Sequence, residues 1–160
     1  MFKGSVRENI RFGASASVKL SDAEIQKLAK SVKLSGFLQE LPKQLRSSIE
    51  EGGRNLSGGQ QQKIAILRGL IKEGSILLLD EVTASLDSKS AKEVLDGILN
   101  TSRKVTTLMI THKLRSEALK ADRIVVLGKK GVIADGSHDT LLKTCALYQK
   151  LWEASSTENS

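Results

Sequence analysis

The chain has 160 residues, 39% of them hydrophobic, which is enough for one domain with a buried core and excludes wholesale disorder. Its formal net charge of +7 could favour binding to nucleic acid, to an anionic membrane surface or to a polyphosphate ligand. The basic residues are scattered, however, and only 3% of residues are aromatic, so a solvated basic surface is the favoured interpretation. No apolar run is long enough to span a bilayer, no N-terminal segment has the pattern of a signal peptide, and the single Cys145 excludes an intrachain disulfide.

The first predicted helix begins near Ser21. This serine stands three residues before Glu24, the spacing of a capping box, and apolar residues follow at helical intervals, with Gly36 just past the expected end. Residues 37–45 form a further short apolar segment, and the polar, glycine-containing residues 47–55 are expected to be a loop.

A second helical pattern begins at Ser57, a residue type that favours the N-cap position. Apolar residues then recur on one face, and Gly74 is the expected terminator. The apolar run at 76–79 is too short for a helix and is typical of a strand buried on both faces of a parallel sheet.

Strands and helices alternate over the rest of the chain. Asp87 has the position of an N-cap for a helix that runs to about Asn100. The other predicted elements are a turn at 83–86, a buried strand at 105–111, a short helix near 118–121, a strand at 124–127 joined by a hairpin to 132–134, and a last helix at about 139–154. This alternation predicts an α/β domain with a largely parallel sheet, in which ligands collect at the carboxyl ends of strands. Asp80, Glu81 and His112 fall at such ends.

The acidic pair after the first buried strand can serve phosphate chemistry. A magnesium ion bound to a nucleotide prefers a hard oxygen ligand such as Asp80, and Glu81 could orient a water for attack on phosphorus. Taken alone, an apolar run that ends in two acids often marks only the solvent boundary of a strand. His112 could donate a hydrogen bond to a γ-phosphate, although a lone histidine near a strand end is more often an ordinary polar residue.

The turn at Ser57-Gly58-Gly59 has the makings of an anion site. Successive backbone N–H groups at a helix start attract a phosphate, and the serine hydroxyl adds a donor. The alternative is an N-cap followed by two flexible glycines. Each glycine lowers helix stability by about 1 kcal/mol relative to alanine, so a purely structural cap would have little reason to include both.

Together, these motifs resemble those of ATP-binding-cassette (ABC) ATPases. Leu56-Ser57-Gly58-Gly59-Gln60 resembles the signature motif, residues 76–81 the Walker B strand, residues 85–87 the D-loop, and Thr111-His112 the switch histidine. Further segments, at 4–13, 47–53 and 136–148, are similar to the exporter-type branch, so the resemblance covers nearly the whole chain. Gln61 and Lys63 depart from it, because the family often has arginines there, and so does Glu50, which stands at a usual glycine.

The resemblance implies a partial P-loop NTPase (ABC ATPase) fold, with a mostly parallel sheet, flanking helices and a helical signature subdomain. The implied division is a helical subdomain at about 1–72, a catalytic-core half at about 73–154, and a flexible tail at 155–160. The Walker A lysine, the Q-loop glutamine, the adenine-stacking aromatic and the transmembrane domains of the family have no counterpart in the 160 residues.

The resemblance also implies a role for each motif residue. ATP and Mg²⁺ would be the cofactors, and the partners would be a second nucleotide-binding domain and transmembrane domains. By this resemblance, the γ-phosphate of an ATP held by the partner cassette would be contacted by Ser57, Gly58, Gly59 and Gln60. Asp80 would bind magnesium, Glu81 would polarise the attacking water, and His112 would hold the γ-phosphate. Asp87 would reach across the dimer interface, and Glu51 would lie near the coupling helices of a transmembrane domain.

Three hypotheses follow. The first is the ATP-hydrolysing domain portion of an exporter-type ABC transporter, which powers transport and is held at the cytosolic side of a membrane by transmembrane partner domains. The second is a non-catalytic fragment or interaction module that donates its signature motif to another cassette. The third, a soluble ABC ATPase acting on nucleic acid or ribosomes, is disfavoured by the exporter-like segments, so no nucleic acid is expected. We expect the isolated chain neither to bind ATP tightly nor to hydrolyse it.

Overall fold

The fold is known from a computed structural model, in which the described residues are 1–14, 20–72, 74–100 and 105–155. They form two units, Met1–Met109 and Ile110–Ser160, each of which is described by itself below. A helix capable of crossing a bilayer is not found in the described ranges. Of the tail predicted at 155–160, residues 156–160 lie outside these ranges.

Three helices of the first unit begin with the same device. Each N-cap serine accepts a hydrogen bond from a backbone N–H three residues later, and the side chain of that later residue bonds back to the N-cap backbone. The helices are α1 (Val6–Arg11), α2 (Asp22–Ser31) and α4 (Gly58–Ile71), capped by the pairs Ser5 with Glu8, Ser21 with Glu24, and Ser57 with Gln60. The capping box predicted at Ser21 and the N-cap predicted at Ser57 are therefore confirmed.

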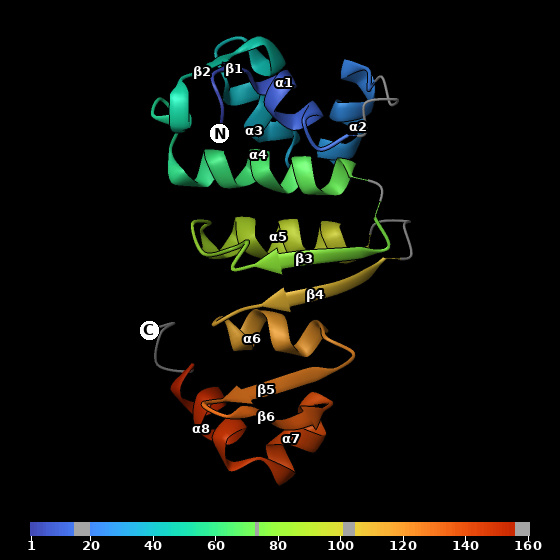
Figure 1. Ribbon diagram of the computed structural model, residues 1–160, viewed down its shortest axis with the longest axis vertical. Helices are drawn as coiled ribbons and strands as arrows, with labels where there is room; N and C mark the ends of the chain where they lie inside the picture. The colour runs from blue at the N-terminus through green and yellow to red at the C-terminus, as the bar shows by residue number, and fades with distance from the viewer. Residues whose placement is uncertain (15–19, 73, 101–104, 156–160) are drawn as a thin grey trace. The chain divides into compact units, whose positions relative to one another are not determined.

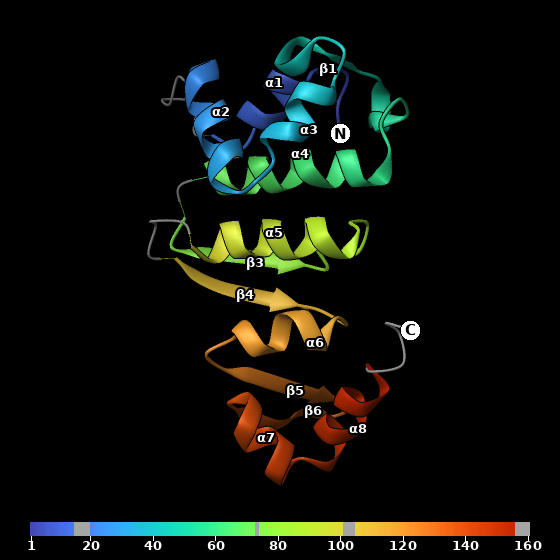
Figure 2. The ribbon, with the colours of Figure 1, turned by 180° about the vertical axis from the view of Figure 1, so that it is seen from behind.

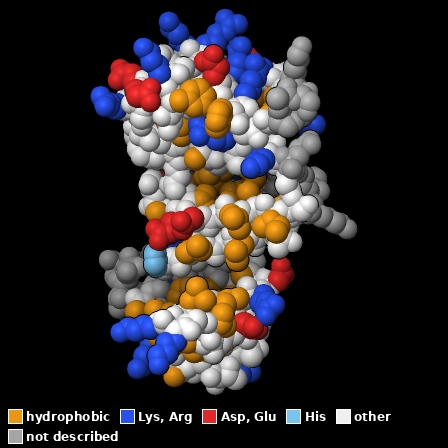
Figure 3. Space-filling model, viewed as in Figure 1, with side chains coloured by type: hydrophobic (Ala, Val, Ile, Leu, Met, Phe, Trp, Pro, Cys, Tyr) orange, Lys and Arg blue, Asp and Glu red, His pale blue; other side chains and the backbone are white. Residues whose placement is uncertain are grey.

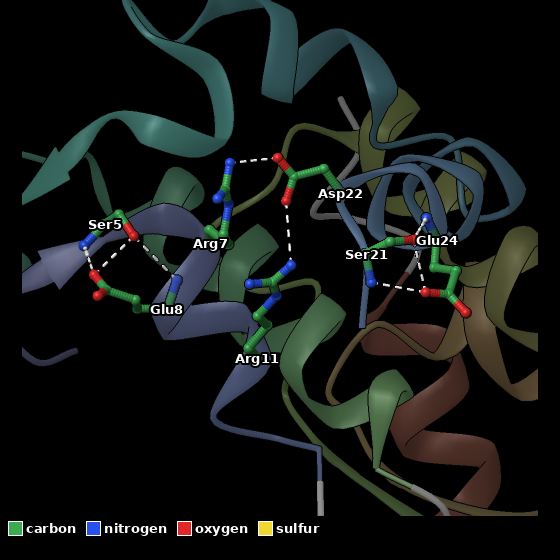
Figure 4. A network of polar contacts seen from close by, with 7 residues as sticks. All are labelled: Ser5, Arg7, Glu8, Arg11, Ser21, Asp22 and Glu24. Atoms are coloured by element: carbon green, nitrogen blue, oxygen red, sulfur yellow. Dashed lines mark hydrogen bonds and ion pairs between the residues drawn. The ribbon is translucent and has the colours of Figure 1, made fainter. Parts of the chain in front are cut away.

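A shared carboxylate joins α1 to α2. Figure 4 shows the guanidinium groups of Arg7 and Arg11 on α1 both reaching Asp22, the first residue of α2. The Arg11 Nη2 to Asp22 Oδ1 distance is 3.4 Å. This pair of contacts supplements the two capping boxes, which are drawn in the same figure.

The end predicted for α2 at Gly36 is wrong, because the helix closes earlier through Lys33. Lys33 takes the left-handed conformation (φ 59°), its N–H donates to Lys30 O at 3.2 Å, and the Leu34 N–H donates to Ala29 O at 2.7 Å. These are the two bonds of a Schellman motif, usually completed by glycine. Gly36 instead lies inside α3 (Ser35–Glu40).

Short elements link these helices. An antiparallel pair joins β1 (Gly4–Ser5) to β2 (Ser48–Ile49), and two 3₁₀ turns flank β2, η1 (Gln44–Arg46) and η2 (Glu51–Gly53). The segment predicted as a loop at 47–55 therefore contains a two-residue strand. Arg68 of α4 is hydrogen-bonded to α1. Its Nε donates to the backbone oxygen of Asn9 at 2.8 Å, and its Nη2 donates to the Asn9 side-chain oxygen at 3.0 Å.

A β–α–β unit completes the first unit. Strand β3 (Ile76–Asp80) leads through α5 (Ser88–Leu99) to β4 (Thr106–Ile110), which pairs with β3, and the two arrows point the same way in Figure 1. The turn predicted at 83–86 is present, and Asp87 is the N-cap of α5, as expected. Parallel pairing with a helical crossover is the unit of an α/β fold.

The burial of β3 on both faces, expected from the sequence, is wrong for the described residues. Leu79 is 7% exposed, whereas Ile76 and Leu78 are 65% and 69% exposed. Successive strand side chains point to opposite faces, and within the first unit only the Leu79 face joins the core made with the helices. Leu108 and Ile110 of β4 are exposed too, and Figure 3 shows hydrophobic side chains at the surface over these strands.

The second unit is a hairpin with small helices. Helix α6 (Leu114–Glu117) and the 3₁₀ turn η3 (Ala118–Lys120) precede the antiparallel strands β5 (Ile124–Gly128) and β6 (Gly131–Gly136), which confirms the predicted hairpin. The single last helix predicted at 139–154 is wrong. It divides at Cys145 (φ −122°, ψ 100°) into α7 (His138–Thr144) and α8 (Ala146–Ala154), both visible in Figure 2.

Candidate functional site

The signature-like turn opens α4 and lies at the surface. The Ser57 hydroxyl accepts from the Gln60 N–H at 3.2 Å, and the Gln60 side-chain oxygen accepts from the Ser57 N–H at 3.0 Å. The N–H groups of Gly58 and Gly59, in the first turn of the helix, have no carbonyl partner within it. Because Ser57 and Gly58 are exposed, this turn presents backbone donors and the positive end of a 14-residue helix to an incoming anion.

The second glycine of the turn has a packing reason as well. A Cβ built on Gly59 would lie 3.1 Å from the Ser85 carbonyl oxygen, tighter than nearly all real contacts. A Cβ on Gly58 would meet the Ser85 hydroxyl at 3.8 Å, which is ordinary contact. Gly59 therefore allows the start of α4 to approach the loop after β3, whereas Gly58 leaves the outer side of the turn open.

The two predicted carboxylates mark the carboxyl end of β3. Asp80 is its last residue and Glu81 the first residue beyond it, and both are exposed. Glu81 takes the left-handed backbone conformation (φ 45°), which is uncommon for a residue with a side chain. The strand thus ends in a sharp turn, closed by the Ala84 N–H, which donates to Glu81 O at 2.9 Å.

Asp80 fits a magnesium ion that is shared with a nucleotide. Within the described ranges, no cluster of three or more His, Cys, Asp or Glu residues could hold a metal by itself. Magnesium in nucleotide sites is held by one or two carboxylates together with phosphates and waters. An exposed carboxylate at the rigid end of a strand suits that arrangement and does not suit an all-protein cage.

Asp87 has a structural role in addition to the one expected. Its Oδ1 accepts from the Ser90 N–H at 2.9 Å, so it caps α5. Hydrogen bonds from the side chain and the backbone of Ser90 lower the pKa of the Asp87 carboxyl from its ordinary value of 3.8. The carboxylate remains at the surface, where a second molecule can also reach it.

The predicted site residues divide between the two units. The first unit contains the turn at Ser57–Gln60 and three further residues, Asp80, Glu81 and Asp87. Within this unit, the turn lies close to the loop after β3. His112 is exposed and belongs to the second unit, two residues after the end of β4. Glu51 is exposed in η2, whose Gly52 and Gly53 both have positive φ.

One residue of this contact was not identified from the sequence. Gln62 on α4 donates through Nε2 to the backbone oxygen of Glu81 at 3.0 Å and accepts from the Ser85 N–H at 3.0 Å through Oε1. The feature of the sequence that could have pointed to Gln62 is the run of three glutamines at 60–62. In the structure, each of the three side chains bonds to a different segment. Gln60 caps the turn, and Gln61 donates to Gly53 O at 3.1 Å.

Comparison with known proteins gives a consistent result. The chain is 39% identical over 150 residues to "ATP-dependent lipid A-core flippase 2" of Colwellia psychrerythraea, a match that covers 94% of this chain and 25% of the flippase. It is 38% identical over 158 residues to "Multidrug resistance protein 1" of Entamoeba histolytica, covering 99% of this chain and 12% of that protein. The chain therefore spans about a quarter of the flippase's length.

A solved structure and a family model agree with these relatives. The structure of a bacterial Atm1-family ABC exporter with ATP bound matches with a TM-score of 0.86 and 32% identity, covering 96% of this chain and 26% of that one. The model of the ABC transporter family matches residues 2–84, just over half of the chain. The expected partial ABC ATPase fold is thereby confirmed, and the chain belongs to the ABC transporter family.

Proposed function

We propose that this chain is an ATP-binding and ATP-hydrolysing domain portion of an exporter-type ABC transporter. The observation that carries this proposal is the close approach of Gly59 to the Ser85 carbonyl, because it brings a phosphate-binding turn and the loop that carries Glu81 together in one unit. The names of the relatives, flippases and multidrug resistance proteins, agree with export driven by ATP. The domain would face the cytosol, held at the membrane by transmembrane domains.

The turn at 57–60 is proposed to bind the γ-phosphate of an ATP held by a second nucleotide-binding domain. Its exposed backbone donors point outward from the helix start, so the nucleotide they reach can belong to another molecule. Asp87, also at the surface, would take part in the same dimer interface. The dimer is therefore part of the proposed site.

The carboxylates are proposed to serve the chain's own nucleotide. Glu81 would orient the attacking water as a general base, and His112 would hold the γ-phosphate. Asp80 would hold a magnesium ion, which supplies charge neutralisation at the β- and γ-phosphates when bound. The protein's contribution is then mainly positioning and electrostatics.

One observation favours a second candidate function. The signature turn is complete and exposed. A non-catalytic module that donates its signature to another cassette needs only that turn. The two candidates differ in whether Glu81 contributes to hydrolysis.

The test is an ATPase assay on a mixture with a complete cassette whose own signature glycines have been replaced. The wild-type chain is expected to restore hydrolysis. Gly58→Asp is expected to abolish the stimulation, a loss of about a hundredfold, because a side chain and a negative charge would block the phosphate. Gly69→Asp is the matched control, since Gly69 is exposed on the same helix with nothing within 4 Å of its added Cβ.

Glu81→Gln then separates the candidates. It is placed in a second mixture, with a complete cassette that keeps its signature but whose own catalytic glutamate is replaced, because Glu81 is proposed to serve the chain's own nucleotide. Hydrolysis that Glu81→Gln abolishes there supports the hydrolytic domain portion, whereas no hydrolysis there, beside stimulation in the first mixture that Gly58→Asp abolishes, supports the signature-donating module. If the wild-type chain restores nothing, both candidates are wrong.

A further inference from the structure

Gln62 makes two hydrogen bonds to the loop that follows β3. Its amide nitrogen donates to Glu81 O and its amide oxygen accepts from the Ser85 N–H, each at 3.0 Å. The partners lie 19 and 23 residues away in the sequence, so the bonds are tertiary contacts. An amide is the side chain that supplies one donor and one acceptor at neighbouring positions.

The loop it binds contains the catalytic candidate in an uncommon backbone conformation. Glu81 has φ 45°, and its carbonyl oxygen already accepts from the Ala84 N–H at 2.9 Å. Gln62 provides a second donor for the same oxygen, which has two lone pairs. Left-handed residues with side chains persist where the surroundings determine them, and Gln62 is part of those surroundings.

The same helix carries the signature-like turn. Gln62 lies in α4 shortly after the turn, and Gly59 approaches Ser85 O so closely that a Cβ would lie 3.1 Å away. The turn therefore passes close to the Ser85 carbonyl, and Gln62 accepts from the Ser85 N–H. A displacement of the start of α4 is transmitted to the loop by the two hydrogen bonds of Gln62, because that residue belongs to the same helix as the turn.

We propose that Gln62 is a positioning residue that couples the signature-like turn to Glu81. This inference rests on the proposed function. When the turn at 57–60 engages a nucleotide held by another cassette, α4 transmits its position through Gln62 to the backbone of Glu81 and Ser85. Binding of the partner's γ-phosphate by the turn thereby influences the position of the Glu81 carboxylate, which serves the chain's own nucleotide.

Two variants and a control test the coupling. Gln62→Leu puts an apolar side chain of comparable volume at this position and loses both hydrogen bonds. Gln62→Glu keeps an acceptor for the Ser85 N–H but loses the donor to Glu81 O. Gln26→Leu makes the same change as Gln62→Leu at an exposed position of α2, away from this loop.

Hydrogen exchange on the isolated chain reads the position of the loop directly. The Ser85 amide is expected to exchange about fivefold faster in Gln62→Leu, because its acceptor is lost, and at the wild-type rate in Gln62→Glu and Gln26→Leu. A Ser85 exchange rate that is unchanged in Gln62→Leu would overturn the proposal. Unfolding curves of the same samples verify that each variant is folded.

The second ATPase mixture described above, in which hydrolysis depends on Glu81, reads the functional consequence. Gln62→Leu is expected to lower the stimulated kcat about tenfold and leave the KM for ATP unchanged, because it misplaces groups without removing a nucleotide contact. A raised KM with kcat unchanged would contradict positioning. If the wild-type chain stimulates nothing, the proposed function fails, and the exchange rates still decide whether Gln62 holds the loop.

Discussion

The two units differ in how their structure is maintained. The first unit has a large core contributed by all its helices and by β3, and its candidate site residues are fixed by hydrogen bonds between segments far apart in sequence. In the described part of the second unit, the buried hydrophobic cluster has four members, Val126, Leu141, Cys145 and Tyr148, with partly buried residues packed against it. Beside this cluster lies an aromatic group in which the ring centroids of His138 and Trp152 are 4.3 Å apart. The positions of the first-unit site residues therefore depend on many contacts, whereas the stability of the second unit depends on few. Loss of one buried side chain should therefore destabilise the second unit most.

The largest effect is expected for Tyr148→Ala. Tyr148 is 1% exposed, and its hydroxyl lies 2.8 Å from His138 Nδ1, so the variant loses one of the four members of that cluster and a partly buried hydrogen bond. We expect the second unit to lose about 3–5 kcal/mol. Trp152, the single tryptophan of the chain, reports it by fluorescence during urea unfolding.

Tyr148→Phe is the matched control, because it keeps the ring and removes only the hydroxyl, for a loss of about 1 kcal/mol. Equal unfolding curves for Tyr148→Ala and the wild type would contradict the view that so few residues sustain the second unit.

A smaller effect, confined to the first unit, is expected for Gly97→Ala. A Cβ on Gly97 of α5 would lie 2.5 Å from Val32 Cα at the end of α2, so α5 must move away. Overpacking of this kind costs about 1–3 kcal/mol. Far-UV circular dichroism should detect the loss of first-unit helix while Trp152 fluorescence is unchanged.

Gly69→Ala controls for helix propensity. Gly69 is also inside a helix, but nothing lies within 4 Å of its added Cβ, so alanine should stabilise it by about 1 kcal/mol. Destabilisation by both alanines would refute the packing argument.

What the sequence predicts well is local chemistry. The caps at Ser21, Ser57 and Asp87 are determined within a few residues and were predicted correctly. The positive φ of Lys33 and of Glu81 was not, because neither residue type favours it and each is held by contacts that the pattern does not reveal. The left-handed residue at 33 is also why Gly36 was wrongly taken as a helix end.

The candidate site shows the same division. Its chemistry-bearing residues were found because strand ends and glycine turns have sequence signatures. Gln62 was missed because its partners, Glu81 and Ser85, are identified only by the folded chain. The exposed face of β3 was missed for a related reason: an apolar run predicts that both faces are buried but does not specify what covers them.

A still smaller effect, of opposite sign, is expected for Glu81→Gly. Relief of the left-handed conformation at φ 45° should raise the stability of the first unit by up to about 1 kcal/mol, while the carboxylate needed for hydrolysis is lost. Lys33→Gly is the matched control, because Lys33 has φ 59° outside the site and should gain similar stability with stimulation of ATPase intact. Thermal unfolding and the second ATPase mixture together check both. A destabilising Glu81→Gly would show that its side chain outweighs the backbone strain.

The last contrast is in pH dependence. In the first unit, hydrogen bonds from Ser5 and Ser21 hold the pKa values of Glu8 and Glu24 below their ordinary value of 4.5. Such groups contribute stability above pH 4.5, and this stability is lost as the pH falls through the lowered pKa. In the second unit, burial raises the pKa of Tyr148 from 10.0, so its contribution is present below pH 10 and is lost as the pH rises above it. Acid should therefore weaken the first unit first, and alkali the second.

Urea unfolding at several pH values checks this contrast, with circular dichroism for the first unit and Trp152 fluorescence for the second. Glu24→Gln should reduce the acid dependence of the first unit, since the amide keeps an acceptor for Ser21 but does not titrate in this range. Tyr148→Phe should remove the alkaline loss, because it has no phenol to ionise. If both units weakened together at each extreme, their stabilities would be coupled, and the difference drawn from their cores would not describe how the chain unfolds.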